Sequence, residues 1–329
     1  MSRPRKPDWL AVQPPAGKEF TGIKETLRDH DLTTVCEEAN CPNLGECWSG
    51  RTRGSPNGEA TDAADGPGSD GGGTATFMLM GDSCTRNCGF CDVDTGGGQP
   101  LDPDEPANVA SAVAEIGLDY VVLTSVDRDD LDGQGAGHFA ETIREIKRRD
   151  PGILVEVLIP DFQGERRLVR KIVDAGPDVI AHNVETVQRL QGRVRDPRAG
   201  YERSLRVLEQ AARESDAYTK TSVMLGHGEY DHEVYRTLAD LREADVDVVT
   251  LGQYLRPSRD HLPVEKYVHP DKYDAWRRVA EEELDFLYCA SGPMVRSSYK
   301  AGELFVESVL RDGKTVEQAR DEARAAVGD

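Results

Sequence analysis

Six of the seven cysteines in this chain fall into two groups of three. The two groups are Cys36, Cys41 and Cys47, with the spacing C-x4-C-x5-C, and Cys84, Cys88 and Cys91, with the spacing C-x3-C-x2-C. A [4Fe-4S] cluster is commonly held by four cysteine thiolates, so three cysteines leave one iron atom for a different ligand. The sequence therefore predicts two [4Fe-4S] clusters, each with one iron that is not bound by cysteine.

A structural zinc site is the alternative for these cysteines. Zinc sites of that kind take four ligands, usually from two C-x2–4-C pairs. The short loop that carries Cys84, Cys88 and Cys91 offers no fourth cysteine or histidine. Its spacing is more typical of three corners of an iron–sulfur cube, and a cysteine-rich zinc module with a structural role is the competing interpretation from another class of protein.

The composition limits the partners and the compartment. The chain of 329 residues carries 60 Asp and Glu against 40 Lys and Arg, a net charge of −20. Nucleic-acid binding needs a basic surface, so we expect no nucleic-acid partner. Arginine outnumbers lysine thirty to ten, and this acidic, lysine-poor composition predicts a salt-rich cytoplasm; an ordinary acidic mesophilic enzyme is the alternative.

No segment approaches the ~20 apolar residues of a membrane span, and no apolar run follows the basic residues 1–6 as it would in a secretory signal. We therefore expect a cytoplasmic protein with no membrane partner, and its large charge favours a monomer. Thiols stay reduced in that compartment, which favours metal ligation over disulfides. The seventh cysteine, Cys289, lies in an apolar run and is predicted to be a small buried side chain.

From residue 75 onward, short apolar runs alternate with longer helical stretches. The expected strands are 76–80, 120–124, 153–159, 179–181, 221–225 and 246–251, and the expected helices are 106–116, 139–149, 166–175, 201–213 and 232–244. This alternation is typical of βα units around a parallel sheet, and we count six units. A further helix at 272–283, a short apolar run at 286–289 and helices after residue 300 follow.

Six units can form an open doubly wound sheet or a partly closed barrel. The first expected strand leads into residues 81–84 and the cysteine loop, where a doubly wound sheet would place a glycine-rich phosphate turn. In α/β barrels the site lies at the carboxyl ends of the strands. We therefore predict the α/β class, a partial (β/α)6 TIM-like barrel over 74–269, with an N-terminal extension (1–53), an acidic flexible linker (54–73) and a C-terminal extension (270–329).

The motif C-x3-C-x-aromatic-C after a first strand, with Phe90 as the aromatic residue, resembles the signature of the radical S-adenosylmethionine (SAM) superfamily. The N-terminal cysteine group narrows the resemblance to the lipoyl synthase family, over nearly the whole chain. The matching segments are K-P-D-W-L (6–10), G-T-A-T-F-M-L-M (73–80), T-S-V-D-R-D-D-L (124–131), H-N-V-E-T-V (182–187), M-L-G-H-G-E (224–229), G-Q-Y-L-R-P-S (252–258) and R-S-S-Y (296–299). Relative to that family, 54–73 resembles an insertion.

The resemblance implies that Cys84, Cys88 and Cys91 hold the cluster whose open iron binds SAM. It also implies that Ser298 completes the auxiliary cluster of Cys36, Cys41 and Cys47. The implied reaction inserts two sulfur atoms, donated by the auxiliary cluster, at C6 and C8 of an octanoyl chain on a lysine. The alternatives are another sulfur-inserting or methylthiolating radical SAM enzyme and, for Ser297 and Ser298, a turn that caps a helix.

The family also implies protein partners. These are an octanoylated lipoyl-carrier domain or a glycine-cleavage H protein, a ferredoxin or flavodoxin that donates electrons, and an iron–sulfur cluster carrier. By analogy with the superfamily, Thr124, Ser125 and Asp127 are expected near the SAM amino group. Asn183 and Glu185 are expected at its ribose or methionine end, and for each of these residues loop capping is the alternative.

Three further features carry weaker interpretations. Gly226 and Gly228 fit either a close approach to a cofactor or a simple turn. Arg193, Arg195 and Arg198 form a basic island, which could meet an acidic carrier domain or pair with neighbouring carboxylates. His227 occupies a position where the family pattern predicts an apolar residue; we interpret it as a surface substitution with no assigned role.

Overall fold

The computed structural model describes residues 5–10, 18–30, 32–39, 41, 43–44, 75–298 and 318. Cys47, the predicted linker 54–73 and the helices predicted after residue 300 lie outside this range. The described residues contain most of the predicted barrel and several of the predicted ligands of each cluster.

The described strands form one sheet in the order of the sequence, from β1 to β8. β1 (Thr33–Thr34) pairs antiparallel with β2, and all later neighbours pair in parallel. The other strands are β2 (Ala75–Leu79), β3 (Tyr120–Ser125), β4 (Leu154–Leu158), β5 (Val179–Ala181), β6 (Tyr218–Leu225), β7 (Val248–Gln253) and β8 (Tyr288–Ser291). The six predicted βα units are thus confirmed, and β1 and β8 extend the same sheet at its two edges.

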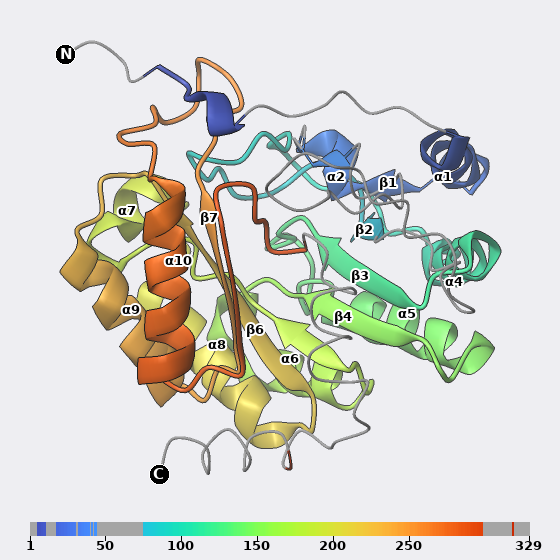
Figure 1. Ribbon diagram of the computed structural model, residues 1–329. Helices are drawn as coiled ribbons and strands as arrows, with labels where there is room; N and C mark the ends of the chain where they lie inside the picture. The colour runs from blue at the N-terminus through green and yellow to red at the C-terminus, as the bar shows by residue number, and fades with distance from the viewer. Residues whose placement is uncertain are drawn as a thin grey trace, which may run out of the picture.

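Helices lie around the outside of the curved sheet (Figure 1). The main ones are α4 (Glu105–Ile116), α5 (Ala136–Arg149), α6 (Arg166–Val173), α8 (Tyr201–Glu214), α9 (Asp231–Glu243) and α10 (Pro270–Arg278). The other described elements are α1 (Lys18–Asp29) and the short η1 (Asp8–Leu10), α2 (Val35–Glu38), η2 (Phe162–Gly164), η3 (Gln188–Leu190) and α7 (Gln191–Val194). The helix predicted over 272–283 ends as α10 at Arg278 and continues as a π-helical turn, η4 (Val279–Glu283).

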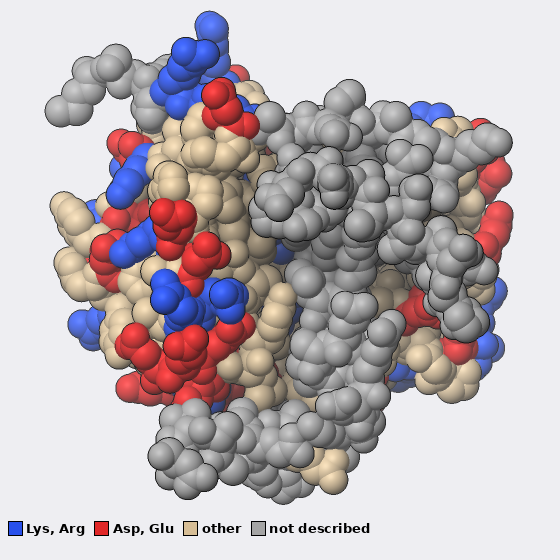
Figure 2. All heavy atoms as spheres, viewed as in Figure 1, with Lys and Arg blue, Asp and Glu red and all other residues tan. Residues whose placement is uncertain are grey.

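The helices pack through apolar stripes. On α5, Phe139, Ile143 and Ile146 recur at helical spacing and are almost completely buried. The opposite faces are polar, and Figure 2 shows Asp and Glu side chains spread among Lys and Arg on the face of the molecule formed by α9 and α10. None of the described helices combines the length and apolar composition that a bilayer crossing requires.

Alternation along the strands separates an outer core from the barrel interior. Val121 and Leu123 of β3 pack in the cluster under the helices, whereas Tyr120 and Val122 join an inner cluster with Val179, Tyr218 and Val248. Further along the inward-facing rows, Thr124, Ser222 and Gly252 line a cavity. The barrel interior is therefore filled at the amino ends of the strands and hollow at their carboxyl ends.

A buried ion pair lies among the inward-facing residues. Lys220 Nζ on β6 lies 2.7 and 2.9 Å from the two carboxylate oxygens of Glu156 on β4. Tyr120 donates a hydrogen bond of 2.6 Å to the same carboxylate. Glu156 is 1% exposed and Lys220 is 6% exposed, so each charge depends on the other for compensation.

Replacement of Lys220 by Met is expected to lower the free energy of unfolding by about 3–5 kcal/mol, because it leaves the Glu156 carboxylate buried without its counter-ion. The exposed pair of Arg170 and Asp174 on α6 supplies the control, since Arg170→Met should cost less than about 1 kcal/mol. Urea denaturation followed by circular dichroism measures both variants. Equal losses in the two variants would contradict the role given to the Glu156–Lys220 pair.

Candidate active site

A cavity of about 550 Å³ lies at the carboxyl ends of the strands. Its wall brings together every predicted site residue that the structure describes. These are Cys36, Cys41, Cys84, Cys88, Phe90, Cys91, Thr124, Ser125, Asp127, Asn183, Glu185 and Ser298. Residues separated by more than 250 positions in the chain thus contribute to one cavity, and its volume suits a substrate of cofactor size.

The loop after β2 carries Cys84, Cys88 and Cys91. Cys84 is fixed at the start of the loop, where its N–H donates to the Asp94 carbonyl at 2.8 Å and its carbonyl accepts from Gly96 N at 2.9 Å. At the far end, Gly89 bonds to Val194 O at 2.9 Å and to Leu262 N at 3.0 Å. The loop is therefore tied both to its own return segment and to loops that follow β5 and β7.

The three thiols suit a cluster better than a single metal ion. Burial raises the pKa of Cys88 to about 12 and that of Cys91 to about 11, so a thiolate at either position requires a bound cation. Within the described residues, no three His, Cys, Asp or Glu side chains are gathered as the ligands of one ion would be. An iron–sulfur cube places each cysteine on a different iron, which fits three thiols facing one cavity from a single loop.

Backbone N–H groups hydrogen-bond to all three of these cysteines, including Val93 to Cys91. The N–H groups of Arg86 and Asp127 donate to Cys84 Sγ at 3.4 and 3.3 Å. The N–H of Asp196 donates to Cys88 Sγ at 3.3 Å. Donors of this kind stabilise negative charge on sulfur, as a cluster ligand requires.

Ligands of the second predicted cluster come from the two extensions. Cys36 lies on α2, Cys41 follows that helix, and Ser298 follows β8; all three line the cavity. Asn43 Nδ2 donates a 2.6 Å hydrogen bond to the carbonyl of Met294. This bond joins the segment of the N-terminal cysteines to the segment of Ser298, so the two extensions meet at the cavity.

The polar side chains after β3 and β5 suit a polar ligand. Ser125 Oγ and Asn183 Oδ1 are buried and have no hydrogen-bond partner among the described residues, which is uncommon for buried polar atoms. Glu185 follows β5 with a left-handed φ of 68°, and burial raises the pKa of its carboxyl group. These groups can accept hydrogen bonds from the amino group or hydroxyls of a nucleoside ligand such as SAM.

Arg195 is a cavity residue that the sequence analysis did not assign to the site. It is 8% exposed, and its guanidinium donates to Ser204 Oγ at 2.8 Å. Arg193 instead pairs with Glu265, and Arg198 pairs with Asp196. The three arginines therefore do not form one surface patch. The two exposed ones, Arg193 and Arg198, pair with neighbouring carboxylates, which was one of the two interpretations of the basic island.

The loop after β6 corrects one prediction. Gly226 and Gly228 adopt φ values of 108° and 98°, and the Glu229 carboxylate accepts the N–H groups of Gly226 and His227; these glycines form a turn. His227 is only 2% exposed and stacks on Tyr254 with ring centroids 4.1 Å apart. The prediction that His227 lies on the surface is wrong. The family pattern, which has an apolar residue at this position, was the sequence signal that the position is buried.

Comparison with known proteins agrees with this arrangement. The model of the Radical SAM superfamily matches residues 78–241. A crystal structure of methylornithine synthase superposes with a TM-score of 0.51 at 14% identity, covering 63% of this chain and 61% of that one, which supports the fold alone. The fold and the cysteine loop place the chain among the radical SAM proteins.

Full-length relatives define the family within that class. The N-terminal domain model of lipoyl synthase matches residues 1–41. A lipoyl synthase of Halobacterium salinarum is 72% identical over 329 residues, all of both chains, and the human mitochondrial lipoyl synthase is 53% identical, covering 95% of this chain and 80% of the relative. The chain belongs to the lipoyl synthase family.

Replacing His227 by Leu is expected to make folding less sensitive to acid. Burial lowers the pKa of His227 to about 4, whereas an unfolded histidine titrates near ~6.5. Between about pH 6.5 and 4 the unfolded chain therefore binds a proton that the folded chain does not, which destabilises the folded state by up to about 3 kcal/mol. Thermal unfolding across this pH range should show that loss reduced in His227→Leu.

The exposed His232 on α9 provides the matched control, and His232→Leu should keep the acid sensitivity of the parent protein. Identical pH profiles for His227→Leu and His232→Leu would contradict the burial of His227.

Proposed function

We propose that this chain is a lipoyl synthase that inserts two sulfur atoms at C6 and C8 of an octanoyl chain on a protein lysine, giving the dihydrolipoyl group. The observation that supports this proposal is that cysteines from both groups, together with Ser298, line one cavity. A reaction that joins hydrogen removal to sulfur delivery needs both centres to reach the same acyl chain.

The chain's own residues hold the two centres. Cys84, Cys88 and Cys91 bind the cluster that receives SAM. Cys36, Cys41, Cys47 and Ser298 bind the auxiliary cluster, with serine as a harder and less usual ligand than the thiolates. When bound, these groups and SAM supply radical removal of hydrogen from unactivated C–H bonds and the sulfur that replaces it.

Other cavity residues orient SAM. The buried guanidinium of Arg195 is suited to pair with the SAM carboxylate. Asn183 and Glu185 would contact its ribose or methionine end, and Thr124, Ser125 and Asp127 would lie near its amino group. Phe90, within the cysteine loop, provides an aromatic contact.

The remaining wall suits an alkyl chain. Apolar side chains of the cavity include Met78, Val126, Leu158, Met224 and Val295. Alkyl C–H bonds offer no acidic proton to a general base, so the protein contributes position and exclusion of water rather than acid–base catalysis. These apolar side chains can hold C6 and C8 in place through packing alone.

The partners follow from this activity. The substrate is an octanoylated lipoyl-carrier domain or a glycine-cleavage H protein, the electron donor is a ferredoxin or flavodoxin, and a cluster carrier rebuilds the auxiliary centre. The chain acts as a monomer, because its large negative charge disfavours self-association.

The test uses the full chain, reconstituted with iron and sulfide without oxygen and incubated with SAM, a reductant and an octanoyl-lysine peptide. Mass spectrometry should detect a product that has gained two sulfur atoms. One sulfur or a methylthio group would point to a different radical SAM enzyme, and a colourless protein with stoichiometric zinc and no acid-labile sulfide would contradict the proposal.

Ser298→Ala is expected to abolish the lipoyl product while reductive cleavage of SAM continues in part, because only the auxiliary cluster loses a ligand. Ser297→Ala, which alters the neighbouring hydroxyl, is the control and should retain product. Both are measured by quantifying peptide product and methionine in one reaction. Full product yield from Ser298→Ala would remove Ser298 from the ligand set.

A further inference from the structure

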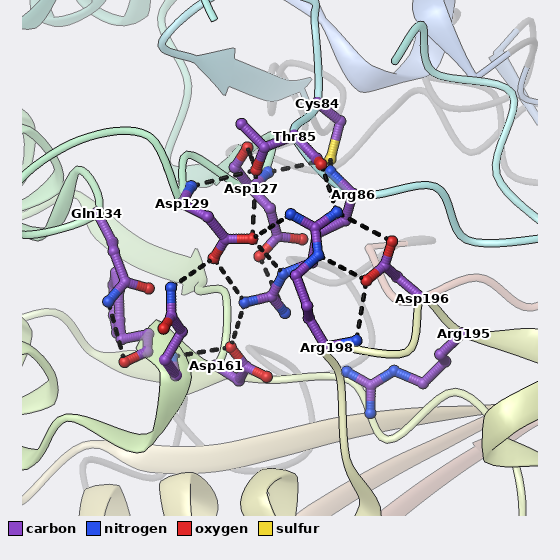
Figure 3. A network of polar contacts seen from close by, with 12 residues as sticks. Cys84, Thr85, Arg86, Asp127, Asp129, Gln134, Asp161, Arg195, Asp196 and Arg198 are labelled. Carbon is purple, nitrogen blue, oxygen red and sulfur yellow. Dashed lines mark hydrogen bonds and ion pairs between the residues drawn. The ribbon is translucent and has the colours of Figure 1, made fainter. Parts of the chain in front are cut away.

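A buried arginine lies between two cysteines of the cluster loop. Arg86 is only 3% exposed, and its guanidinium contacts three carboxylates. It donates to both oxygens of Asp129 at 2.8 Å and to Asp161 at 2.7 Å, and its Nη1 lies 3.3 Å from Asp127. Figure 3 shows these groups converging beside Cys84.

The three carboxylates fix the cysteine loop to two neighbouring loops of the barrel. Asp127 and Asp129 follow β3, and Asp161 follows β4. The adjacent Thr85 strengthens the attachment, since its N–H and hydroxyl donate to Asp127 O at 3.0 and 2.8 Å and its hydroxyl accepts from Asp129 N at 3.1 Å. Arg86 is thus the centre of the contact between the cysteine loop and the barrel.

A second ion pair extends this contact to the loop after α7. Asp196 accepts a 2.9 Å hydrogen bond from Asn87 N in the cysteine loop. Arg198 donates to Asp196 at 2.9 Å and lies 3.3 Å from Asp129. This arrangement connects the loops after β3, β4 and β5 through one set of charges around the cysteine loop (Figure 3).

A backbone hydrogen bond from Val93 reaches Cys91 outside this set, but three backbone donors to the cluster sulfurs belong to it. They are the N–H groups of Arg86 and Asp127, which donate to Cys84 Sγ, and the N–H of Asp196, which donates to Cys88 Sγ. Holding Arg86, Asp127 and Asp196 in place therefore also holds three N–H···S hydrogen bonds in place.

Stability alone is a weak reason for this cluster of charges. Buried ion pairs lose most of their Coulombic gain to desolvation, and well-packed apolar residues often replace them without loss. A positive charge and aligned N–H dipoles near a cluster do have a distinct consequence, because charge and hydrogen bonds to the sulfurs set its reduction potential.

We propose that Arg86 is a positioning residue that sets the reduction potential of the cluster on Cys84, Cys88 and Cys91. It does so by holding the two N–H donors against Cys84 Sγ, by supporting the Asp196 donor to Cys88 through Asp129 and Arg198, and by placing a buried positive charge beside the sulfurs. The inference rests on the proposed function, since it requires that these cysteines bind the cluster of SAM. Both effects favour the reduced, more negative state of the cluster, so loss of Arg86 makes reduction harder.

The experiment is a redox titration of the full chain, loaded with both clusters and followed by electron paramagnetic resonance. The component of the reduced spectrum that changes when SAM is added reports the cluster on Cys84, Cys88 and Cys91, separately from the auxiliary one. Iron and sulfide counts and the thermal midpoint are recorded for every variant.

Arg86→Gln is expected to shift the midpoint potential of the SAM-responsive component to more negative values. Arg86→Lys keeps the charge but loses the planar fork that spans Asp129 and Asp161, so its shift should be smaller. The control is Arg170→Gln, which alters an exposed arginine on α6 and should leave the potential unchanged.

A purely structural role would lower cluster occupancy or the thermal midpoint and leave the potential of the occupied cluster unchanged, and that result would overturn the inference. If Arg86→Gln fails to hold the cluster, the midpoint potential of the SAM-responsive component is measured in Arg198→Gln instead. Arg198 is half exposed in the parent protein, so its replacement should shift the midpoint potential to more negative values by less than loss of Arg86 would. Such a shift supports the inference, whereas an unchanged potential contradicts it. A parent protein without any SAM-responsive signal would instead refute the cluster assignment itself.

Discussion

Parallel pairing of β2 to β7 is the constraint on which the site depends. Because these six strands run in one direction, their carboxyl ends and the loops that follow them meet at the same end of the barrel. The inward-facing rows are filled near the amino ends by Tyr120, Val122 and the Glu156–Lys220 pair, and they become cavity wall further along. The same inward-facing rows of side chains thus fill the barrel at the amino ends of the strands and line the cavity at their carboxyl ends.

The same constraint gives the cysteine loop its neighbours. Strand order follows sequence order, so the loops after β3 and β4 are adjacent to the loop after β2 and can supply Asp127, Asp129 and Asp161 to Arg86. The extensions complete the cavity from outside the barrel, and the Asn43–Met294 hydrogen bond joins them. The proposed SAM cluster would therefore be held by the barrel, and the proposed auxiliary cluster by segments that pack on it.

Local sequence patterns were sufficient for the strands and main helices of the six βα units. Strong alternation and helical spacing located the six βα units to within a few residues, and β8 was found two residues later than its apolar run suggested. Longer-range contacts were not predictable. The sequence shows Arg195 and Arg198 as similar exposed arginines, but only the fold buries the first in the cavity and pairs the second with Asp196. His227 was misplaced for a different reason: its polarity was given more weight than the apolar residue that the family pattern predicts at this buried position against Tyr254.

One chain holds two iron–sulfur centres of different function, one that receives SAM and one that donates sulfur. Quantitative Mössbauer spectroscopy of oxygen-free, iron-57-loaded protein, with acid-labile sulfide determined on the same sample, tests this most directly. We expect two [4Fe-4S] clusters per chain, of which one changes its spectrum on addition of SAM. A single cluster per chain in fully loaded protein would contradict it.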